Sequence, residues 1–593
     1  MTKRKASFIN FIIALIPVII LAVLISVFFD YYYELNDDVL MKDILSGMYD
    51  GTPSGYNIQM QWPLSAFVAQ LYRAYPAGCW YGVMLLLFQY GSLIIIDYRL
   101  IKRIEKIWIK ILTSVSFITL ISSYMLFHLC CVQYTVTVAM MAGAAIAVMS
   151  ACDDENHGSI IYGNVPTILI LFFGFMLRSE MMLLMMPFVC AAAVFKWSLG
   201  KRKYSKDTLK GYIRVFAIIA ISFLIALGAN KVAYRTEEWS NFVDLFDART
   251  ELYDYQVPPS YEGNERFYNA IDFSKEEAVL FENYNYGMDK KVDNKLMWAV
   301  ANYAGDVNKS SRSTVTKLSE KLKIYVYEFT HVWSAPGTDY PWNIAVILLY
   351  VFCLIMLVFN RDFIGIWRIL ALFAGRSAIW IYMLMGERTP ARITDSLYFV
   401  ETITLIFLLG MLMSFNQNKA DDKERADKKV NITTVVASAL ALLLGVVFLM
   451  QAIPQVEYDE ELKAQTNAPY MEFFEYINAH PHNVYLMDTY SSVAYSEKMF
   501  DTKVALIDKS NMNTLGGWAA LSPIEKNKLS SRGVGSMFTG MLKGEVYFCK
   551  KSDIDMDWLE ALYRVNDINV DINLEDTVSS FEIYRVTEKK GEQ

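Results

Sequence analysis

Two adjacent acidic residues, Asp37 and Asp38, lie a few residues beyond the first long apolar segment of the chain. A carboxylate can take the proton of a hydroxyl group that lies within hydrogen-bond reach. At a membrane surface such a carboxylate would meet both a lipid-borne molecule and an aqueous one. The pair therefore indicates proton-transfer chemistry at the membrane boundary, provided that the neighbouring segments place it there.

The first apolar segment, Phe8 to Phe29, is long enough to cross a hydrocarbon core of about 30 Å. Lys3, Arg4 and Lys5 precede it, and positive charges beside a spanning segment favour the cytoplasmic side. We therefore expect the amino terminus in the cytoplasm and the acidic pair outside the plasma membrane.

The whole chain has the composition of a polytopic membrane protein, because 54% of its 593 residues are hydrophobic. Its cysteines show neither a disulfide framework nor zinc spacing, and no basic groove with aromatic residues indicates a nucleic-acid partner. Ten further apolar segments follow the first. They run from Trp80 to Tyr98, Trp108 to Phe127, Tyr134 to Met149, Ile160 to Leu177, Met181 to Phe195, Tyr212 to Leu227, Ile344 to Phe359, Phe363 to Met385, Leu397 to Phe415 and Ile432 to Met450.

About eleven spans, an odd number, place the carboxyl terminus outside. Most lysines and arginines of the short loops fall in the segments assigned to the inside, as this orientation requires. The inner loop Cys152 to Gly158 is acidic and carries no positive charge, so the fourth and fifth spans are the least supported. The predicted division is a transmembrane domain at 1–453, with outer loops at 31–77 and 233–342, and an extracytoplasmic domain at 454–593.

In the first outer loop, apolar residues between Leu40 and Met48 recur at helical spacing, which predicts an amphipathic helix along the membrane interface. Asn36 would cap this helix, with Asp37 and Asp38 in its first turn. Acidic residues there also stabilise the helix dipole by about 0.3 to 1 kcal/mol without any catalytic role. A purely structural role is therefore the alternative for this pair.

The carboxyl-terminal segment alternates short apolar runs with helical patterns, which predicts an α/β domain. Strands are expected at Val484–Met487, Val504–Ile507, Val546–Phe548 and Phe581–Val586, and helices at Pro469–Ala479 and Asp555–Val565. Trp518 follows Gly516 and Gly517, so its ring could stack on a sugar, although a packed tryptophan beside a glycine turn is the commoner arrangement.

Several arginines could bind an anionic headgroup. Arg376 lies about 14 Å inside the ninth span, where a cation is costly and usually marks a ligand site or an ion pair. Arg249, in the middle outer loop, either binds a phosphate with its planar fork or pairs with Glu251 or Asp254. The remaining candidates are near the ends of spans, at Arg178, Arg388 and Arg392.

The acidic first outer loop, from Asn36-Asp37-Asp38 through Gly47 to Gly51-Thr52-Pro53, resembles that of a bacterial group of GT-C membrane glycosyltransferases. The resemblance extends to the cytoplasmic amino terminus, the many spans and the outer carboxyl-terminal domain. It implies a polyprenyl-phosphate-linked sugar as donor, a glycan, lipid or protein of the cell envelope as acceptor, and inversion at the sugar carbon.

The same resemblance implies a base or cation-ligand role for the first-loop acids. Asp38 is our first choice for the base and Asp37 our second, and either could hold a divalent cation, although no metal-binding signature fixes one. Glu180 and Trp518 are assigned to the acceptor. Two other classes stay open, namely a transporter or flippase of a lipid-linked sugar and a noncatalytic cell-envelope assembly protein. We find no internal repeat of the kind common in transporters.

Overall fold

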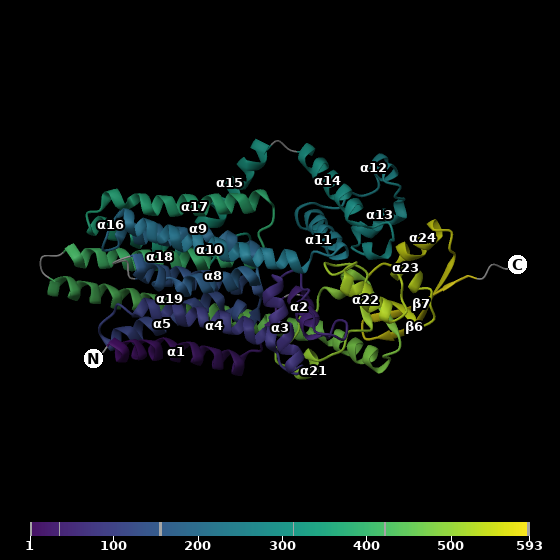
Figure 1. The fold of residues 1–593 in the computed structure, drawn as a ribbon, viewed down its shortest axis with the longest axis horizontal. Coiled ribbons are helices and arrows are strands. Elements are labelled where there is room, and N and C mark those ends of the chain that lie inside the picture. The colour runs from purple at the N-terminus through teal and green to yellow at the C-terminus, as the bar shows by residue number, and fades with distance from the viewer. Residues whose placement is uncertain (1–2, 35, 153–156, 312–313, 420–422, 590–593) are drawn as a thin grey trace.

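The computed structural model describes residues 3–34, 36–152, 157–311, 314–419 and 423–589. A long helical bundle forms one half of the molecule (Figure 1), and the outer loops gather with the carboxyl-terminal domain at one end of it. The amino terminus lies at the opposite end of the bundle (Figure 1). The predicted architecture, a helical membrane domain followed by an α/β domain, is confirmed.

Ten helices in the described part of the chain are long and apolar enough to cross a membrane. They are α1 (Lys3–Phe28), α4 (Trp80–Ile101), α5 (Ile107–Cys130), α6 (Tyr134–Ala151), α9 (Ser179–Leu199), α10 (Lys206–Ala233), α16 (Trp342–Phe359), α17 (Ile366–Met385), α18 (Ala391–Lys419) and α19 (Lys423–Ala479).

The fifth predicted span is interrupted. It forms two helices, α7 (His157–Gly163) and α8 (Val165–Leu177), with Asn164 between them and Pro166 in the first turn of α8, where proline favours a helix start. Helix α8 is short, but it joins the same two ends of the bundle as α6. Asn164 contacts Cys152 at one end of α6, and Arg178 lies over the ring of Tyr134 at the other. Most of the acidic loop between α6 and α7 lies outside the described residues.

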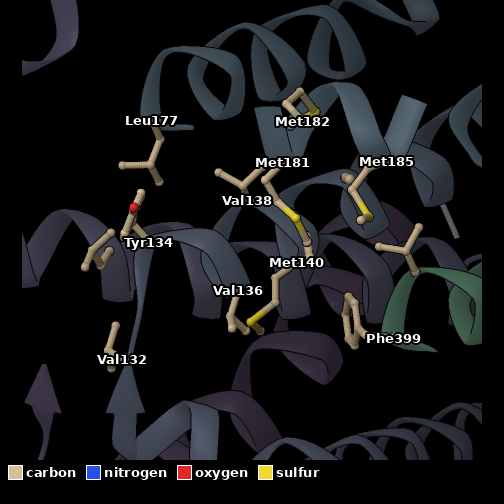
Figure 2. Packing of buried hydrophobic residues seen from close by; sticks show 14 of the residues in the cluster. Val132, Tyr134, Val136, Val138, Met140, Leu177, Met181, Met182, Met185 and Phe399 are labelled. Carbon is tan, nitrogen blue, oxygen red and sulfur yellow. The ribbon is translucent and has the colours of Figure 1, made fainter. Parts of the chain in front are cut away.

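Helix α6 forms the centre of the bundle, and its side chains from Tyr134 to Ser150 are all buried. A helix that is apolar on every side needs partners all round it. Figure 2 shows Met181 and Met185 of α9 and Phe399 of α18 near Val138 and Met140 of α6. The end of α6 that begins at Tyr134 is therefore held firmly by its neighbours and supports the residues that pack on it.

The first outer loop contains a two-residue strand and two helices, which are β1 (Tyr32–Tyr33), α2 (Asn36–Ser46) and α3 (Trp62–Ala74). Strand β1 runs parallel to β2 (Cys131–Val132), the connection between α5 and α6. The amide of Tyr33 also donates to the carbonyl of Glu497, 3.0 Å away, in the carboxyl-terminal domain. The segment that leads into α2 is thus held between the bundle and that domain.

The prediction for α2 needs one correction. The apolar face is buried as expected, but Lys42, Asp43 and Ser46 on the other face are buried too. The carboxyl-terminal domain covers this polar face, so α2 is not a helix with one side in water.

The middle outer loop is helical. Its elements are α11 (Glu237–Thr250), the π-helix η1 (Glu251–Tyr255), α12 (Glu265–Ala270), α13 (Lys275–Glu282), the 3-10 helix η2 (Tyr286–Met288), α14 (Asn294–Ser311) and α15 (Thr314–Thr330). A further 3-10 helix, η3 (Phe363–Gly365), precedes α17.

The carboxyl-terminal domain has a five-stranded mixed sheet with the order β4-β3-β5-β7-β6. The strands are β3 (Val484–Met487), β4 (Met512–Thr514), β5 (Val546–Lys551), β6 (Val570–Val578) and β7 (Phe581–Glu588). Strand β3 is parallel to β4 and β5, and β7 is antiparallel to β5 and β6. The helices around them are α20 (Thr489–Ser492), α21 (Thr502–Ala505), α22 (Pro523–Ser531), α23 (Met537–Gly540) and α24 (Asp557–Val565).

Three predicted strands are confirmed, but Val504–Ile507 is wrong. Asp501 accepts a hydrogen bond from the amide of Lys503 and starts the short helix α21 there. Strand β6 was not predicted, because it is an edge strand whose side chains between Asp571 and Thr577 are mostly exposed and polar. Helix α19 runs without interruption across residue 454, the predicted boundary between the domains.

Candidate active site

Asp37 and Asp38 lie in the first turn of α2, as predicted. Successive residues of a helix point in directions about 100° apart, so the two carboxylates face different surroundings. Asp38 is fully buried, whereas Asp37 is half-buried. The two acids are therefore not interchangeable.

Asp38 points into the protein. Its Oδ1 accepts hydrogen bonds from the hydroxyl of Tyr81 at 2.7 Å and from the amide of Tyr134 at 3.4 Å, while Oδ2 is buried without a partner. Burial raises the pKa of Asp38 well above its usual range, and the charges of Asp37 and Glu34 add to this against the opposing hydrogen bonds. These hydrogen bonds make Asp38 a buried carboxyl group that ties α2 to α4 and α6.

Asp37 is coupled electrostatically to a group of cations and phenols. Its charge acts electrostatically on the guanidinium groups of Arg178 and Arg249. It acts also on the phenols of Tyr134 and Tyr284. These residues come from three separate parts of the chain, the start of α6, the α8–α9 junction and the middle outer loop. We call Asp37, Arg178, Arg249, Tyr134 and Tyr284 the Asp37 cluster.

Arg178 lies at the junction between α8 and α9, where the chain is extended. Its guanidinium donates to Oε1 of Gln59, and Nε lies 3.2 Å from the carboxylate of Glu180. The group also lies 5.3 Å from the centre of the Tyr134 ring. Arg178 is thus positioned from several sides, with 29% of its side chain still exposed.

Arg249 lies in the last turn of α11 and is held by aromatic residues. It donates to the hydroxyl of Tyr284 and lies within 5.9 Å of the ring centres of Tyr253 and Tyr284. Its Nε is buried and has no hydrogen-bond partner. No ion pair joins it to Glu251 or Asp254 in the described part of the chain, so neither acid neutralises it by direct contact.

The turn that contains Trp518 packs against the backbone of Tyr284. A Cβ atom on Gly516 would lie 1.8 Å from the carbonyl oxygen of Tyr284, so only glycine fits this contact. The hydroxyl of Tyr286 donates to the carbonyl of Gly517 at 2.5 Å. Trp518 itself is 7% exposed, which is the packed arrangement named above as the commoner one.

Arg388 and Arg392 lie before and at the start of α18. Arg388 forms an ion pair of 2.5 Å with Asp254, whose charge also acts on Arg178 and Arg249. The charge of Arg392 acts on the phenol of Tyr134. Both arginines therefore border the Asp37 cluster, and Arg392 is half-buried with no ion-pair partner among the described residues.

Arg376 is not part of this group. Its fully buried guanidinium lies 2.9 Å from the carboxylate of Glu401 and donates to the hydroxyls of Tyr325 and Tyr398 at 2.7 and 2.9 Å. The rings of Phe329 and Trp380 lie 4.2 and 4.3 Å away. This is the structural ion pair that the sequence left open as the alternative.

Glu180 is exposed over 72% of its side chain and contacts the cluster only through Arg178. The sequence gave no sign of Tyr134 or Tyr284, since a tyrosine at a helix start or in an aromatic loop has no distinctive pattern. It also missed His128, which is 2% exposed. Nε2 of His128 lies 3.0 Å from Asp395, and Nδ1 lies 3.6 Å from Glu34, so this side chain links α5 and α18 to the segment before α2.

Four buried charges hold α2 against the carboxyl-terminal domain. Nζ of Lys42 lies 2.7 Å from both Asp43 and Glu497, and Nζ of Lys509 lies 2.8 Å from Asp43 and 3.4 Å from Glu497. No side chain of the four is more than 6% exposed. Burial alone lowers the pKa of Lys42, but the two carboxylates raise it above its ordinary value, so the lysine stays charged. We call these residues the Lys42 tetrad.

No group of three or more His, Cys, Asp or Glu side chains in the described ranges is arranged to hold a metal ion.

No protein-family model matches the sequence, and no curated protein matches it significantly. Two crystal structures of ArnT from Cupriavidus metallidurans align with almost the whole length of this chain. The apo structure is 11% identical, covers 96% of both chains and has a TM-score of 0.38. The structure bound to undecaprenyl phosphate is 10% identical, covers 98% of this chain and 97% of that chain, and has a TM-score of 0.33.

Proposed function

We propose that the protein is an inverting membrane glycosyltransferase of the GT-C type, with Asp37 as its general base. The donor is a polyprenyl-phosphate-linked sugar, and the acceptor is a hydroxyl-bearing glycan, lipid or protein outside the membrane. The observation that carries this proposal is the position of Asp37, which is half-buried in the first turn of α2 and whose charge acts on Arg178 and Arg249. This coupling supports the assignment of a base and of phosphate-binding cations to one site.

In the proposed reaction, Asp37 accepts the proton of the acceptor hydroxyl as the hydroxyl oxygen forms a bond to the anomeric carbon of the sugar. The bond from that carbon to the phosphate oxygen breaks, and the electron pair leaves with the polyprenyl phosphate. Direct displacement of this kind inverts the anomeric carbon. A positioned carboxylate base contributes about 10²- to 10⁴-fold to such a rate.

The leaving phosphate gains negative charge, and fixed guanidinium groups stabilise that charge. Arg249 supplies a half-buried guanidinium group that forms no ion pair in the described chain. Arg392 is a second cation without an ion-pair partner in the described chain. Arg388 becomes available to the phosphate if its pair with Asp254 opens.

The structure leads us to prefer Asp37 to Asp38, which reverses the order chosen from the sequence. A base must reach the acceptor and must be ionised. Asp38 has no exposed surface, and burial keeps its pKa well above the usual range. Its two hydrogen bonds instead hold the first turn of α2 in place and so orient Asp37.

The test compares Asp37→Asn, Asp38→Asn and Asp30→Asn. Asp30 is a matched control, because it is an exposed acid of the same outer segment and pairs only with the exposed Lys498. Each purified variant is assayed for sugar transfer from a polyprenyl-phosphate donor, and its thermal unfolding is measured. Asp37→Asn should lose at least about 100-fold in kcat with an unchanged unfolding temperature. Asp30→Asn should behave as the parent protein.

Asp38→Asn should keep more activity than Asp37→Asn, since an amide can still accept the hydrogen bond from Tyr81. Full activity in Asp37→Asn would refute the base assignment. Absence of transfer by the parent protein, with all envelope donors tried, would refute the enzyme assignment. The transporter alternative was based on Arg376 and on the outer basic cluster, and of these Arg376 is paired with Glu401.

A further inference from the structure

A cavity of about 590 Å³ lies at the end of the bundle opposite the carboxyl-terminal domain, between α1, α4, α6 and α8. Phe8 and Phe11 of α1 form one wall, Pro166 of α8 lies opposite, and Val148 of α6 lies on the floor. Val148 is 1% exposed, whereas Phe8 and Phe11 are 64% and 44% exposed. The cavity is therefore a groove that opens sideways from the bundle.

The groove has a fixed width. The hydroxyls of Ser7 on α1 and Tyr98 on α4 are hydrogen-bonded at 2.9 Å, which holds the two helices together beside it. Phe8, Phe11 and Val148 offer no hydrogen bonds to water. A space of this kind that faces the hydrocarbon region is filled by an apolar chain, because leaving it empty forfeits van der Waals contacts along the whole lining.

One end of the groove carries two positive charges. Arg4 and Arg99 both line it, and neither has a carboxylate within ion-pair distance in the described part of the chain. The guanidinium of Arg99 lies only against the ring of its neighbour Tyr98, 5.8 Å from its centre. Two unpaired guanidinium groups at a membrane surface form a site for a phosphate, which they bind through charge-assisted hydrogen bonds.

We propose that this groove binds one anionic phospholipid, with its phosphate between Arg4 and Arg99 and an acyl chain along Phe8, Phe11 and Val148. The lipid belongs to the leaflet opposite the Asp37 cluster, which the charge distribution predicts to be the cytoplasmic one. Because α1 is held to the bundle mainly by α4 and α5, the bound lipid adds a further contact that secures α1. This site is separate from the proposed glycosyl transfer.

The test measures lipid retention by native mass spectrometry of the full-length protein, after equal exposure to phosphatidylglycerol or phosphatidylcholine. The parent protein should retain one phosphatidylglycerol in preference to phosphatidylcholine. Arg4→Gln combined with Arg99→Gln should reduce that retention about tenfold. The control combines Lys5→Gln with Lys102→Gln, which removes two exposed charges from the same helix ends and should retain the lipid.

A second variant, Ile94→Trp, fills the groove and leaves both arginines in place, and it should also lose the bound lipid. Equal retention of the two lipids by the parent protein would overturn the proposal. So would equal loss in the arginine variant and in the lysine control, which would indicate general attraction of anionic lipid to a basic surface. Neither result bears on sugar transfer at the other end of the bundle.

Discussion

Lys42 and Glu497 form a buried ion pair of 2.7 Å between α2 and the carboxyl-terminal domain. Five residues before Lys42 in the same helix is Asp37, the proposed base. The Lys42 tetrad therefore couples the position of Asp37 to a domain that begins beyond the last membrane helix. The amide of Lys509 also donates to the carbonyl of Met48 at 3.0 Å, so the contact continues past the end of α2.

Removing one charge of the tetrad should destabilise the protein strongly. In Glu497→Gln the two buried lysines keep only Asp43 as a negative partner, and an uncompensated buried charge costs about 3 to 5 kcal/mol. Thermal unfolding of the detergent-solubilised protein measures this loss. Lys498→Gln, next in the chain, breaks the exposed pair with Asp30 and should cost no more than about 1 kcal/mol. Similar losses in the two variants would contradict a specific stabilising role of the Lys42 tetrad.

Arg376→Gln should impair folding rather than donor binding. The substitution leaves Glu401 buried without a cation, at a cost of about 3 to 5 kcal/mol. We expect a lower unfolding temperature and a lower yield, with an unchanged KM for the donor in the protein that folds. Arg376→Lys keeps the charge and should fall between the parent and Arg376→Gln. If Arg376→Gln had a normal unfolding temperature and a raised KM for the donor, Arg376 would instead be assigned to the phosphate site.

Arg249→Gln should weaken both donor binding and turnover, because it removes a half-buried cation that forms no ion pair in the described chain. Loss of one preorganised donor to a developing anion lowers kcat by about 10²- to 10³-fold. Arg249→Lys should recover only part of the activity, since an ammonium group lacks the planar fork. Arg235→Gln is the control, because Arg235 is an exposed arginine near the start of the same outer loop. Unchanged kinetics in Arg249→Gln would remove this residue from the site.

Stability should depend on pH through Glu525, which is 1% exposed beneath the first outer loop. Burial raises the pKa of its carboxyl group to about 7, against hydrogen bonds from Asn513 and the amide of Leu521. The folded protein then binds more protons than the unfolded chain between pH 4.5 and 7. The contribution of Glu525 to the free energy of unfolding is therefore lost as the pH rises through that window.

Glu525→Gln abolishes that titration. The unfolding temperature of the variant relative to the parent should therefore rise between pH 5 and pH 8. Burial also lowers the pKa of the neighbouring Lys528 to about 7. The titration of Lys528 therefore increases the stability of the protein only as the pH rises above neutral, and it does not mask the effect of Glu525 below pH 7. A constant difference between variant and parent across this range would contradict the assignment.

The sequence by itself determined the membrane helices and the presence of a separate α/β domain. Apolar segments of sufficient length cannot remain in water, and this constraint acts on each segment independently of its partners. The first turn of α2 was also predictable, because helix capping and acidic first-turn residues are local features. One local pattern misled where a second local signal competed with it: at Val504–Ile507 the capping side chain of Asp501 starts a helix in an apolar run.

Only the tertiary structure decided which carboxylate can act. Asp37 and Asp38 are neighbours of the same type, and sequence cannot tell which one the helix turns toward Tyr81 and which one toward Arg178 and Arg249. The same holds for Arg376, whose partner Glu401 is on another helix. Burial, ionisation and access depend on groups brought together from distant parts of the chain, and those long-range contacts are set by packing rather than by any local pattern.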